Sequence, residues 1–309
     1  MKLPQRWFAL ALVLPVLICA ADEGTSTGDA TPAAHASGAD SALAQFESSL
    51  SYKTGTINLA DGFATFALSE RFRFLEAQDA RRLLVQAWGN PPDAVSDVLG
   101  MIVRADSSPL SQDGWGVVVT YRKEGYVKDD DAASIDYDKL LKEMQAGAEE
   151  ENQQRSQKGY ATVKIAGWAE RPFYDAAAHK LYWARELHFS DAPEPTLNYD
   201  IRVLGRRGVL SLNAVAGMKQ LQQIKSDMRE VLSFTEFSAG HRYSEFNGST
   251  DQVAAYGIAA LVAGGVAAKM GLFAKLGILL LSLKKGLVFI LAGAGALVAK
   301  LFKRGGSQS

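Results

Sequence analysis

Carboxylates form the densest group of reactive side chains in this sequence. Five of them fall within ten residues, at Asp129, Asp130, Asp131, Asp136 and Asp138. Hard cations such as Ca²⁺ prefer oxygen ligands, so this run is a candidate cation site or the acidic centre of a hydrolase. The EF-hand spacing is absent, because no glycine stands at the turn position and no glutamate closes the loop. We therefore interpret the run as a loop whose acids cap the following helix and balance its dipole.

Histidine is the second residue type that could take part in acid–base chemistry. The chain has four, His35, His179, His188 and His241, and none forms an i, i+2 or i, i+4 pair with metal-ligand spacing. His188 is expected on the same strand face as Glu186, and it is the candidate base that would accompany the acidic run. The competing interpretation gives this histidine only a structural role, on the surface or in the core.

Other motifs that carry chemistry are missing from the sequence. The segment Gly205–Gly208 is typical of a turn and matches no phosphate-binding fingerprint, and no Gly-x-Ser-x-Gly elbow occurs. Tryptophans beside strand or helix patterns pack in a core more often than they line a ligand groove. The tryptophans in such positions are Trp88, Trp115, Trp168 and Trp183. The sequence therefore assigns no catalytic residue, no cofactor-binding residue and no metal ligand.

The elements that must position these residues follow from hydrophobic periodicity. Strands are predicted on either side of Asp61-Gly62, a short-range hairpin signal. Helices are predicted over Ala77–Trp88, and from Asp136 or Asp138 to about Gln157 with a solvated second half. The other expected elements are the strands Thr56–Leu59, Phe63–Leu68, Val98–Val103, Trp115–Tyr121, Ala161–Ala166, Leu181–Phe189, Leu197–Leu204 and Val209–Val215, and the helix Met218–Leu232.

The order of these elements determines the predicted fold class. It is β-β-α-β-β-α-β-β-β-β-α, which lacks the strict βαβ alternation of a parallel sheet. In Leu197–Leu204, apolar residues alternate with Asn198, Asp200 and Arg202, and this period of two indicates one covered face and one wetter face. We therefore predict an α+β fold over residues 54–246, with one mostly antiparallel sheet and helices packed on it.

The first residues are typical of a secretory signal peptide. Two basic residues precede an apolar core at Trp7–Ile18, and small residues follow. We predict that residues 1–21 are removed, with an uncleaved anchor or lipidation of Cys19 as the alternatives. Residues 22–53 are rich in Ala, Ser, Thr, Gly and Asp, and they are predicted to form a flexible linker.

The other end of the chain is strongly apolar. The stretch Val253–Phe302 contains no Asp or Glu in 50 residues. Residues 22–252 have a net charge of −10, from 24 basic and 34 acidic groups, whereas the tail beyond them has a net charge of +7. An acidic body argues against nucleic acid as a partner, and an apolar basic tail is typical of segments that contact anionic lipid. We predict membrane-associated helices over residues 253–303.

Two arrangements of this tail are compatible with its sequence. One is a helical hairpin that spans the bilayer, and the other is a set of helices that lie in the membrane interface. Lys269 and Lys275 oppose a simple span, because a lysine at the centre of a transmembrane helix costs about 2.5–3.5 kcal/mol. The spacing of Ala260, Gly264 and Ala268 places small residues on one helix face, which favours close helix packing.

Eight stretches of the chain match the motifs of one bacterial family. They are Trp88–Pro92, Leu99–Ile102, Gly125–Ala132, Ile135–Asp138, Gly167–Ala169, Leu181–Ala184, Asn198–Arg206 and Ala255–Gly265. From about residue 54 into the apolar tail, the chain thereby resembles a domain-of-unknown-function family that is described as membrane-anchored. The resemblance implies export and anchoring in the inner membrane of a Gram-negative cell, and it implies no activity, cofactor or substrate.

Taken together, the sequence favours a membrane-anchored envelope protein with its soluble domain on the periplasmic side. Its expected role is non-catalytic binding or assembly. The expected partners are membrane lipid and either an envelope protein or further copies of the chain through the tail; nucleic acid is not expected. The alternative is an envelope hydrolase that uses Asp129–Asp131, Asp136 or Asp138, together with His188, with or without a divalent cation.

Overall fold

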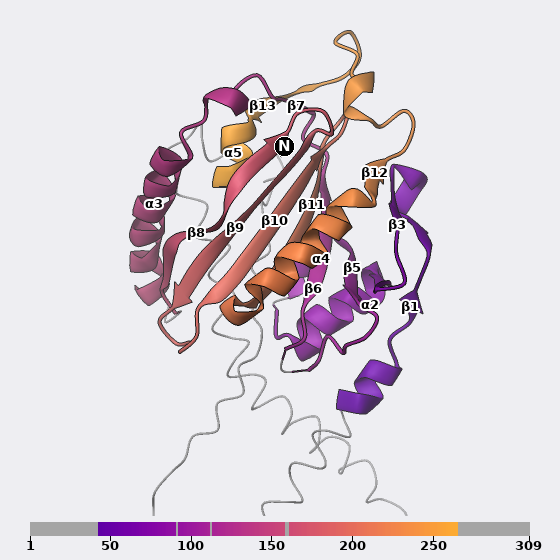
Figure 1. Cartoon of the computed structure of the whole chain (residues 1–309), viewed down its shortest axis with the longest axis vertical. Helices are drawn as coiled ribbons and strands as arrows, with labels where there is room; N and C mark the ends of the chain where they lie inside the picture. The colour runs from indigo at the N-terminus through magenta and orange to yellow at the C-terminus, as the bar shows by residue number, and fades with distance from the viewer. Residues whose placement is uncertain (1–42, 91, 112, 158–160, 265–309) are drawn as a thin grey trace, which may run out of the picture.

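A large antiparallel sheet is the centre of the computed structural model, which describes residues 43–90, 92–111, 113–157 and 161–264 (Figure 1). Within these residues, eight strands are hydrogen-bonded in the order β1-β4-β5-β6-β11-β10-β9-β8, and every neighbouring pair is antiparallel. In this spatial order the strands are Tyr52–Lys53, Phe72–Glu76, Val98–Arg104, Gly116–Arg122, Val209–Gly217, Thr196–Leu204, Lys180–Phe189 and Val163–Asp175. The prediction of an α+β fold with a large antiparallel sheet is confirmed.

Two smaller sheets accompany it. One has three antiparallel strands in the order β12 (Thr235–Phe237), β3 (Ala64–Ala67) and β2 (Thr56–Asn58). The other is a parallel pair, β13 (Val253–Gly257) and β7 (Tyr126–Lys128). The predicted hairpin at Asp61-Gly62 is confirmed, because β2 pairs with β3 and both turn residues have left-handed φ angles, of 58° and 69°.

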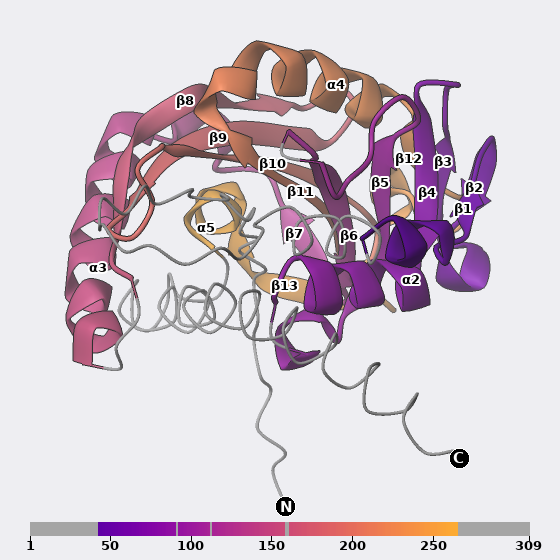
Figure 2. The same cartoon turned by 90° about the horizontal axis from the view of Figure 1, so that it is seen from below.

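Helices lie on both faces of the large sheet and along one edge (Figure 2). The described α-helices are a short one at residues 43–48, α2 (Ala77–Arg82), α3 (Tyr137–Gln157), α4 (Leu221–Ser233) and α5 (Ile258–Ala263). The 3₁₀ turns are η1 (Ala60–Gly62), η3 (Pro92–Val95), η4 (Ala132–Ser134), η5 (Met218–Gln220) and η6 (Tyr243–Glu245), and η2 (Leu83–Ala87) is a π-helical turn. Helix α4 packs on one face, α2 and α5 lie on the other, and α3 lies beside the edge strand β8.

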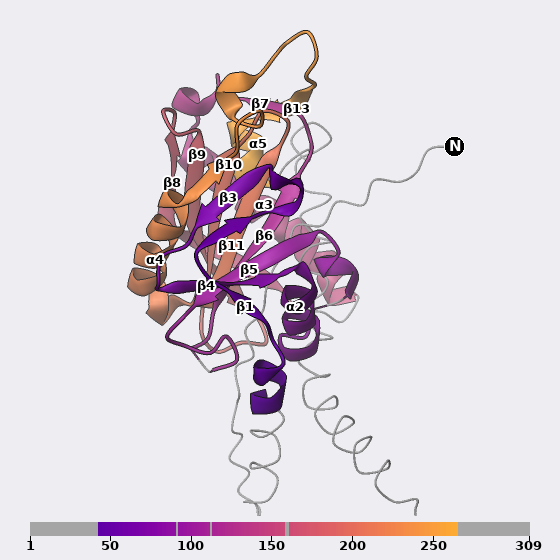
Figure 3. The same cartoon turned by 90° about the vertical axis from the view of Figure 1, so that its right-hand side faces the viewer.

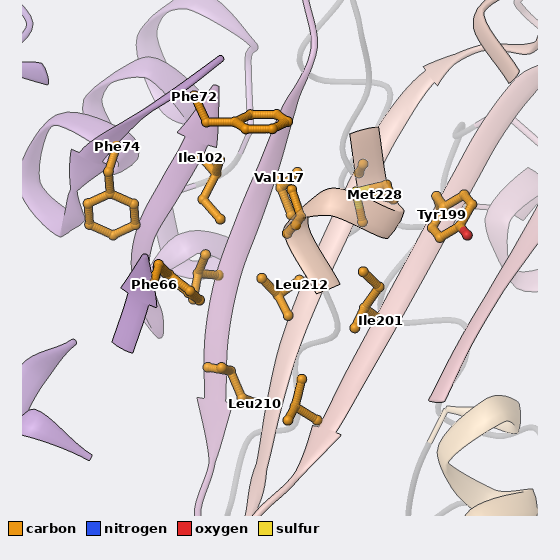
Figure 4. Packing of buried hydrophobic residues seen from close by; sticks show 14 of the residues in the cluster. Phe66, Phe72, Phe74, Ile102, Val117, Tyr199, Ile201, Leu210, Leu212 and Met228 are labelled. Carbon is orange, nitrogen blue, oxygen red and sulfur yellow. The ribbon is translucent and has the colours of Figure 1, made fainter. Parts of the chain in front are cut away.

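One face of the sheet forms a continuous apolar core with α4 and the three-stranded sheet (Figure 4). Phe66 of β3, Met228 of α4 and Leu212 of β11 are all fully buried there. The ring centroid of Phe66 lies 5.9 Å from that of Phe74 and 6.4 Å from that of Phe234. Aromatic side chains bury the largest apolar areas, so this contact joins the small sheet to the large one.

The opposite face carries two separate apolar clusters. Helix α2 and the turn after it pack over β5 and β6, where Leu83 is buried (Figure 3). At the other end of the sheet, α3 and α5 pack around Trp183 of β9. The strand face between them carries Asn198 and Asp200, which we predicted to be the wetter face. That prediction is wrong, since these two residues are only 4% and 2% exposed; polar side chains that bond one another can be buried without solvent.

The two predicted helices in the first half of the chain are confirmed in position. The first continues from α2 through the π-helical turn, ends at Trp88, and is followed by Gly89 with a φ angle of 69°, the left-handed residue expected there. The second is α3, and its second half is mostly solvated as predicted, with Glu149, Glu150 and Gln153 exposed; two residues on the side toward β8 are the exception. Glu151 and Arg155 are 2% and 0% exposed, because this part of the helix still packs beside β8, and the Arg155 Nε donates to the Ala161 carbonyl at 2.5 Å.

Side chains of α3 also cover the open edge of β8. The Asn152 amide donates to the Val163 carbonyl at 2.7 Å and accepts from the Val163 N–H at 2.8 Å, as a neighbouring strand would. Gln145 Nε2 donates to the Ile165 carbonyl at 3.0 Å. An unpaired strand edge is a template for aggregation, so these amides protect the outer strand of the sheet.

Replacing Asn152 by alanine is expected to lower the free energy of unfolding by about 2 kcal/mol, because two hydrogen bonds to β8 are lost at about 1 kcal/mol each. Chemical denaturation measures this change, and light scattering measures the aggregation that an opened edge should add. The exposed neighbour Gln153 is the matched control, and its alanine variant should stay within about 0.5 kcal/mol of the wild type. Equal stability of the two variants would contradict the role of Asn152.

Both boundaries of the folded body are different from those predicted. Residues 22–53 were assigned to a flexible linker, but residues 43–48 form a helix, Leu50 is buried, and Tyr52–Lys53 forms β1 in the large sheet. Residues 253–263 were assigned to membrane-associated helices, but Val253–Gly257 forms β13 and Ile258–Ala263 forms the short helix α5 at the same end as β7 (Figure 1). The side chains of Ile258 and Val262 are buried in the cluster around Trp183. Pairing with β7 and packing against α3 explain the difference, and the rest of the predicted segment, residues 265–303, lies outside the described residues.

No helix within the described part of the chain is both long enough and apolar enough to cross a bilayer.

Candidate functional site

The acidic run is dispersed in the structure. Asp136 caps α3, because its Oδ1 accepts from the backbone N–H groups of Asp138 and Lys139 at 3.1 and 3.0 Å. These bonds, with the nearby Lys139 side chain, hold the pKa of the Asp136 carboxyl below its usual range. Asp138 forms an exposed ion pair with Arg171 at 2.9 Å. Among the residues described, no group of three or more His, Cys, Asp or Glu side chains is placed to hold a metal ion.

Asp131 binds the start of the apolar segment instead. Its Oδ1 accepts from the N–H of Ile258 at 2.9 Å, and its Oδ2 accepts from the N–H of Ala259 at 3.0 Å. The carboxylate is also so close to Gly257 that a Cβ there would lie 2.7 Å from Oδ1. The first N–H groups of a helix have no partner within the helix, so Asp131 supplies the cap of α5 from a loop more than 120 residues earlier in the chain.

Asp129 is the member of the run that meets other reactive groups. The Tyr174 hydroxyl donates to its Oδ2 at 2.7 Å, and the same hydroxyl lies 3.2 Å from His179 Nδ1. His179 Nδ1 is itself 3.6 Å from the Asp129 carboxylate. His179 has a left-handed φ of 53° in the turn between β8 and β9, a backbone conformation that only a few per cent of non-glycine residues adopt. These three side chains form a carboxylate–phenol–imidazole cluster, the Asp129 cluster.

A stack of four rings lies against this cluster. Its order is Phe246, Tyr126, Tyr243 and His179, with neighbouring ring centroids 4.0, 4.3 and 4.1 Å apart. The Tyr243 hydroxyl donates to the Val127 carbonyl at 2.8 Å. The stack therefore joins β7, the turn before β9 and the loop around η6.

The electrostatics of the cluster favour an ionised Asp129 beside neutral phenols. Burial opposes ionisation of Asp129, but the hydrogen bond from Tyr174 and the nearby Tyr243 hydroxyl outweigh it and leave the pKa of this carboxyl below its usual range. Burial and the bond to Asp129 raise the pKa of Tyr174, and burial with the neighbouring Tyr126 raises the pKa of Tyr243. Both tyrosines consequently remain protonated donors at neutral pH.

The histidine that meets Asp129 is not the one considered from the sequence. His188 pairs with Glu186 at 2.6 Å on an exposed part of β9. It is nine residues from His179 along an extended segment, which places the two about 30 Å apart at about 3.3 Å per residue. The structure therefore does not bring His188 and the acidic run together. The signal for His179 was weak, because a single histidine in a turn has no periodic partner.

A second polar group lies on the sheet face between the two apolar clusters, and we call it the polar band. At its centre, Asp200 accepts hydrogen bonds from Arg185 Nη2 at 3.0 Å and from Asn213 Nδ2 at 2.8 Å, and it forms an ion pair with Arg202 Nη2 at 3.0 Å. Arg185 Nη2 also donates to Asn198 Oδ1 at 2.6 Å. The strand register places these residues side by side, since Asp200 lies opposite Trp183 on one side and Asn213 on the other.

The polar band continues toward β7 through Arg202 and Glu124. The Arg202 guanidinium carbon lies 5.1 Å from the centre of the Trp183 ring, a cation–π distance. Glu124 lies 3.7 Å from Arg122 Nη1, and burial raises the pKa of its carboxyl although Arg122 and Arg202 oppose that change. The alternation of Asn198, Asp200 and Arg202 was the sequence signal for this band, but periodicity alone could not separate a solvated face from a buried polar one.

Comparisons with known proteins identify a family and no activity. A comparison with curated proteins finds no match. Among solved structures, the solution structure of cyanobacterial PsbP (CyanoP) from Synechocystis sp. PCC 6803 matches over 61% of this chain and 92% of its own, at 7% identity and a TM-score of 0.34. A likeness this weak supports no conclusion about fold or function. The family model described as "Protein of unknown function (DUF2167)" matches residues 51–295, most of the chain, and the chain therefore belongs to this family.

Proposed function

We propose that this protein is a membrane-anchored envelope protein whose α+β body faces the periplasm and acts in binding or assembly. The observation that carries the proposal is the direct join between the body and the apolar segment. Helix α5 is buried and ends at Gly264, whose φ of 107° closes the helix. In the sequence, the acid-free stretch continues from Gly264 through residues 265–302.

The proposed role is non-catalytic because most of the acidic run serves the fold. Asp131 caps α5, Asp136 caps α3, and Asp138 pairs with Arg171 at the surface. A carboxylate used in this way is held by its own chain and is not free to activate water or bind a cation. The link from Asp131 to α5 gives these acids a structural purpose, which is to fix the body onto the beginning of the apolar segment.

Replacing Asp131 by alanine is expected to lower the free energy of unfolding by about 1 kcal/mol, the usual cost of losing a helix cap. Because the lost bonds belong to Ile258 and Ala259, amide hydrogen exchange should quicken at the start of α5 more than in β9 or β10. Asp130 is the matched control: it is the exposed neighbour, and its alanine variant should leave exchange in α5 unchanged. Faster exchange in both variants would contradict a specific cap.

The location is tested by fractionation and protease mapping. The full chain is expected in the membrane fraction, resistant to extraction by high salt and released by detergent. In spheroplasts, added protease should cleave the body, whereas in intact cells it should not. Recovery of the full chain in the soluble fraction would reject the anchor, and protection of the body in spheroplasts would reject the periplasmic side.

The Asp129 cluster favours an enzyme as a second candidate function. With its Nδ1–H donated to the Tyr174 oxygen and the Tyr174 proton donated to Asp129, His179 would present Nε2 as a general base. In this alternative, His179 replaces His188 as the histidine of the envelope hydrolase considered from the sequence.

Small chromogenic esters and phosphate esters test this alternative. A hydrolase would lose at least about 100-fold in kcat/KM in the His179→Gln variant, because general-base catalysis contributes roughly 10²–10⁴-fold. The His188→Gln variant is the control and should retain full activity. Activity that survives in His179→Gln would exclude this site as its source.

A further inference from the structure

The polar band contains several buried polar atoms that have no hydrogen-bond partner. Among the described residues, both carboxylate oxygens of Glu124, the Trp183 indole Nε1 and the Arg185 Nε have no such partner. The Glu124 side chain is only 9% exposed, and Trp183 is 1% exposed. Native proteins leave few buried polar atoms unpaired, because each one loses its bonds to water and gains none in return.

These atoms lie around one guanidinium group. Arg202 stacks over the Trp183 ring, bonds to Asp200, and acts electrostatically on Glu124. Arg185 bonds to the same Asp200 with its Nη2 and leaves its Nε unpaired. Glu124, Trp183 and Arg185 therefore present an acid, an indole N–H and a guanidinium N–H without hydrogen-bond partners, although Glu124 also forms an ion pair with Arg122 at 3.7 Å.

The other polar side chains of the band are hydrogen-bonded to one another and hold these groups in place. Asp200 accepts two hydrogen bonds and pairs with Arg202, and Asn198 and Asn213 are bonded to Arg185 and Asp200. Side chains fixed in this way lose little further freedom when a ligand binds. Arg185 and Arg202 keep 16% and 17% of their side-chain surface exposed, so the band is not sealed from solvent.

The chemistry of the unpaired atoms defines a ligand. The N–H donors of Trp183 and Arg185, next to the guanidinium groups of Arg185 and Arg202, suit an anion. Glu124 offers two acceptor oxygens for a donor group. A phosphate would satisfy the first set but would be repelled by an ionised Glu124, whereas a carboxylate that also carries an amino or hydroxyl group would satisfy both.

We propose that the polar band binds a small amino acid or hydroxy acid. Its carboxylate accepts from Trp183 Nε1 and Arg185 Nε, and its amino or hydroxyl group donates to Glu124. This site rests on the proposed binding role and names the ligand class for it; it does not depend on where the body is located in the cell.

The first experiment is calorimetry on the full chain, purified from whichever cell fraction holds it. The probes are glycine, lactate, acetate and methylammonium, which separate the carboxylate from the donor group. Saturable binding of glycine or lactate, at least tenfold tighter than binding of acetate and methylammonium, supports the proposal. If acetate binds as tightly as the bifunctional probes, or if no probe binds, the unpaired atoms are bonded to water and the proposal is wrong.

The second experiment distinguishes a binding residue from a structural one. In Glu124→Gln, affinity for the probe that binds best should fall at least tenfold, and the affinity for acetate should stay the same. Without ligand, this variant should unfold at an equal or higher denaturant concentration, since a buried carboxylate without a hydrogen-bond partner is replaced by a neutral amide. A lower unfolding midpoint would show that Glu124 supports the fold and would overturn the assignment. Glu150→Gln, on the exposed side of α3, is the matched control and should change neither quantity.

The two proposals fail in different ways. Fractionation into the soluble pool would reject the membrane anchor while leaving ligand binding intact. A chain found in the membrane that binds none of the probes would retain its location and lose this site.

Discussion

Alanine in place of Phe66 is expected to lower the free energy of unfolding by about 4 kcal/mol, within the range of about 3–5 kcal/mol for large aromatic residues in a core. Phe66 is fully buried on β3, between the large sheet and α4 (Figure 4). Its ring contacts those of Phe74 on β4 and Phe234 just after α4. The substitution therefore removes apolar contacts at the point where the small sheet joins the main core, and the remaining rings can close the cavity only partly.

Phe173 provides the matched control for this substitution. It is also a strand phenylalanine, on β8, but it is 52% exposed. Its alanine variant should differ from the wild type by less than about 1 kcal/mol. Urea unfolding followed by circular dichroism measures both variants, and a loss at Phe66 no larger than the loss at Phe173 would contradict the packing of β3 on the large sheet.

Removing the Asp200 carboxylate is expected to cost about 3 kcal/mol, at the lower end of the range of about 3–5 kcal/mol for breaking a buried ion pair from one side. The Asp200→Ala variant leaves Arg185 and Arg202 facing each other without their shared anion. The lower end applies because each arginine keeps about one-sixth of its side chain exposed to water. Added salt should restore little of the loss, since screening acts mainly on exposed charges.

Two further variants identify the source of this effect. Asp200→Asn keeps the acceptor toward Asn213 and removes only the charge, so it should lose less stability than Asp200→Ala. Asp191→Ala removes an exposed aspartate from the turn before β10, and it should stay within about 0.5 kcal/mol of the wild type. A cost for Asp200→Ala as small as the cost for Asp191→Ala would show that the two arginines find other partners.

Local patterns predicted many elements of this fold correctly. The strands β9, β10 and β11, the Asp61-Gly62 turn, and the helices α3 and α4 all depend on neighbours within a few residues, and all are present. Strand β4 was missed because its five residues, Phe72–Glu76, are few and include two charged residues. The short strand β1 gives no periodic signal, since it has only two residues.

The sequence predicted the candidate site less well than it predicted the fold. The sequence identified the acidic run but not the partner of each acid, because those partners come from distant parts of the chain. Asp129 meets Tyr174 from a strand 45 residues later, and Asp131 caps a helix 127 residues later. Spacing along the chain carries no information about such contacts.

By itself, the sequence determined the α+β class, the large antiparallel sheet and the apolar, acid-free character of the C-terminal stretch, since composition and period are local properties. Only the tertiary structure decided that residues 253–263 belong to the body and that the polar face of β10 is buried. Residues 253–263 are part of the body because β13 pairs with β7. The polar face of β10 can be buried because Arg185 of β9 and Arg202 of β10 both pair with Asp200. Burial depends on what packs against a face, and that is set by residues far away in the chain.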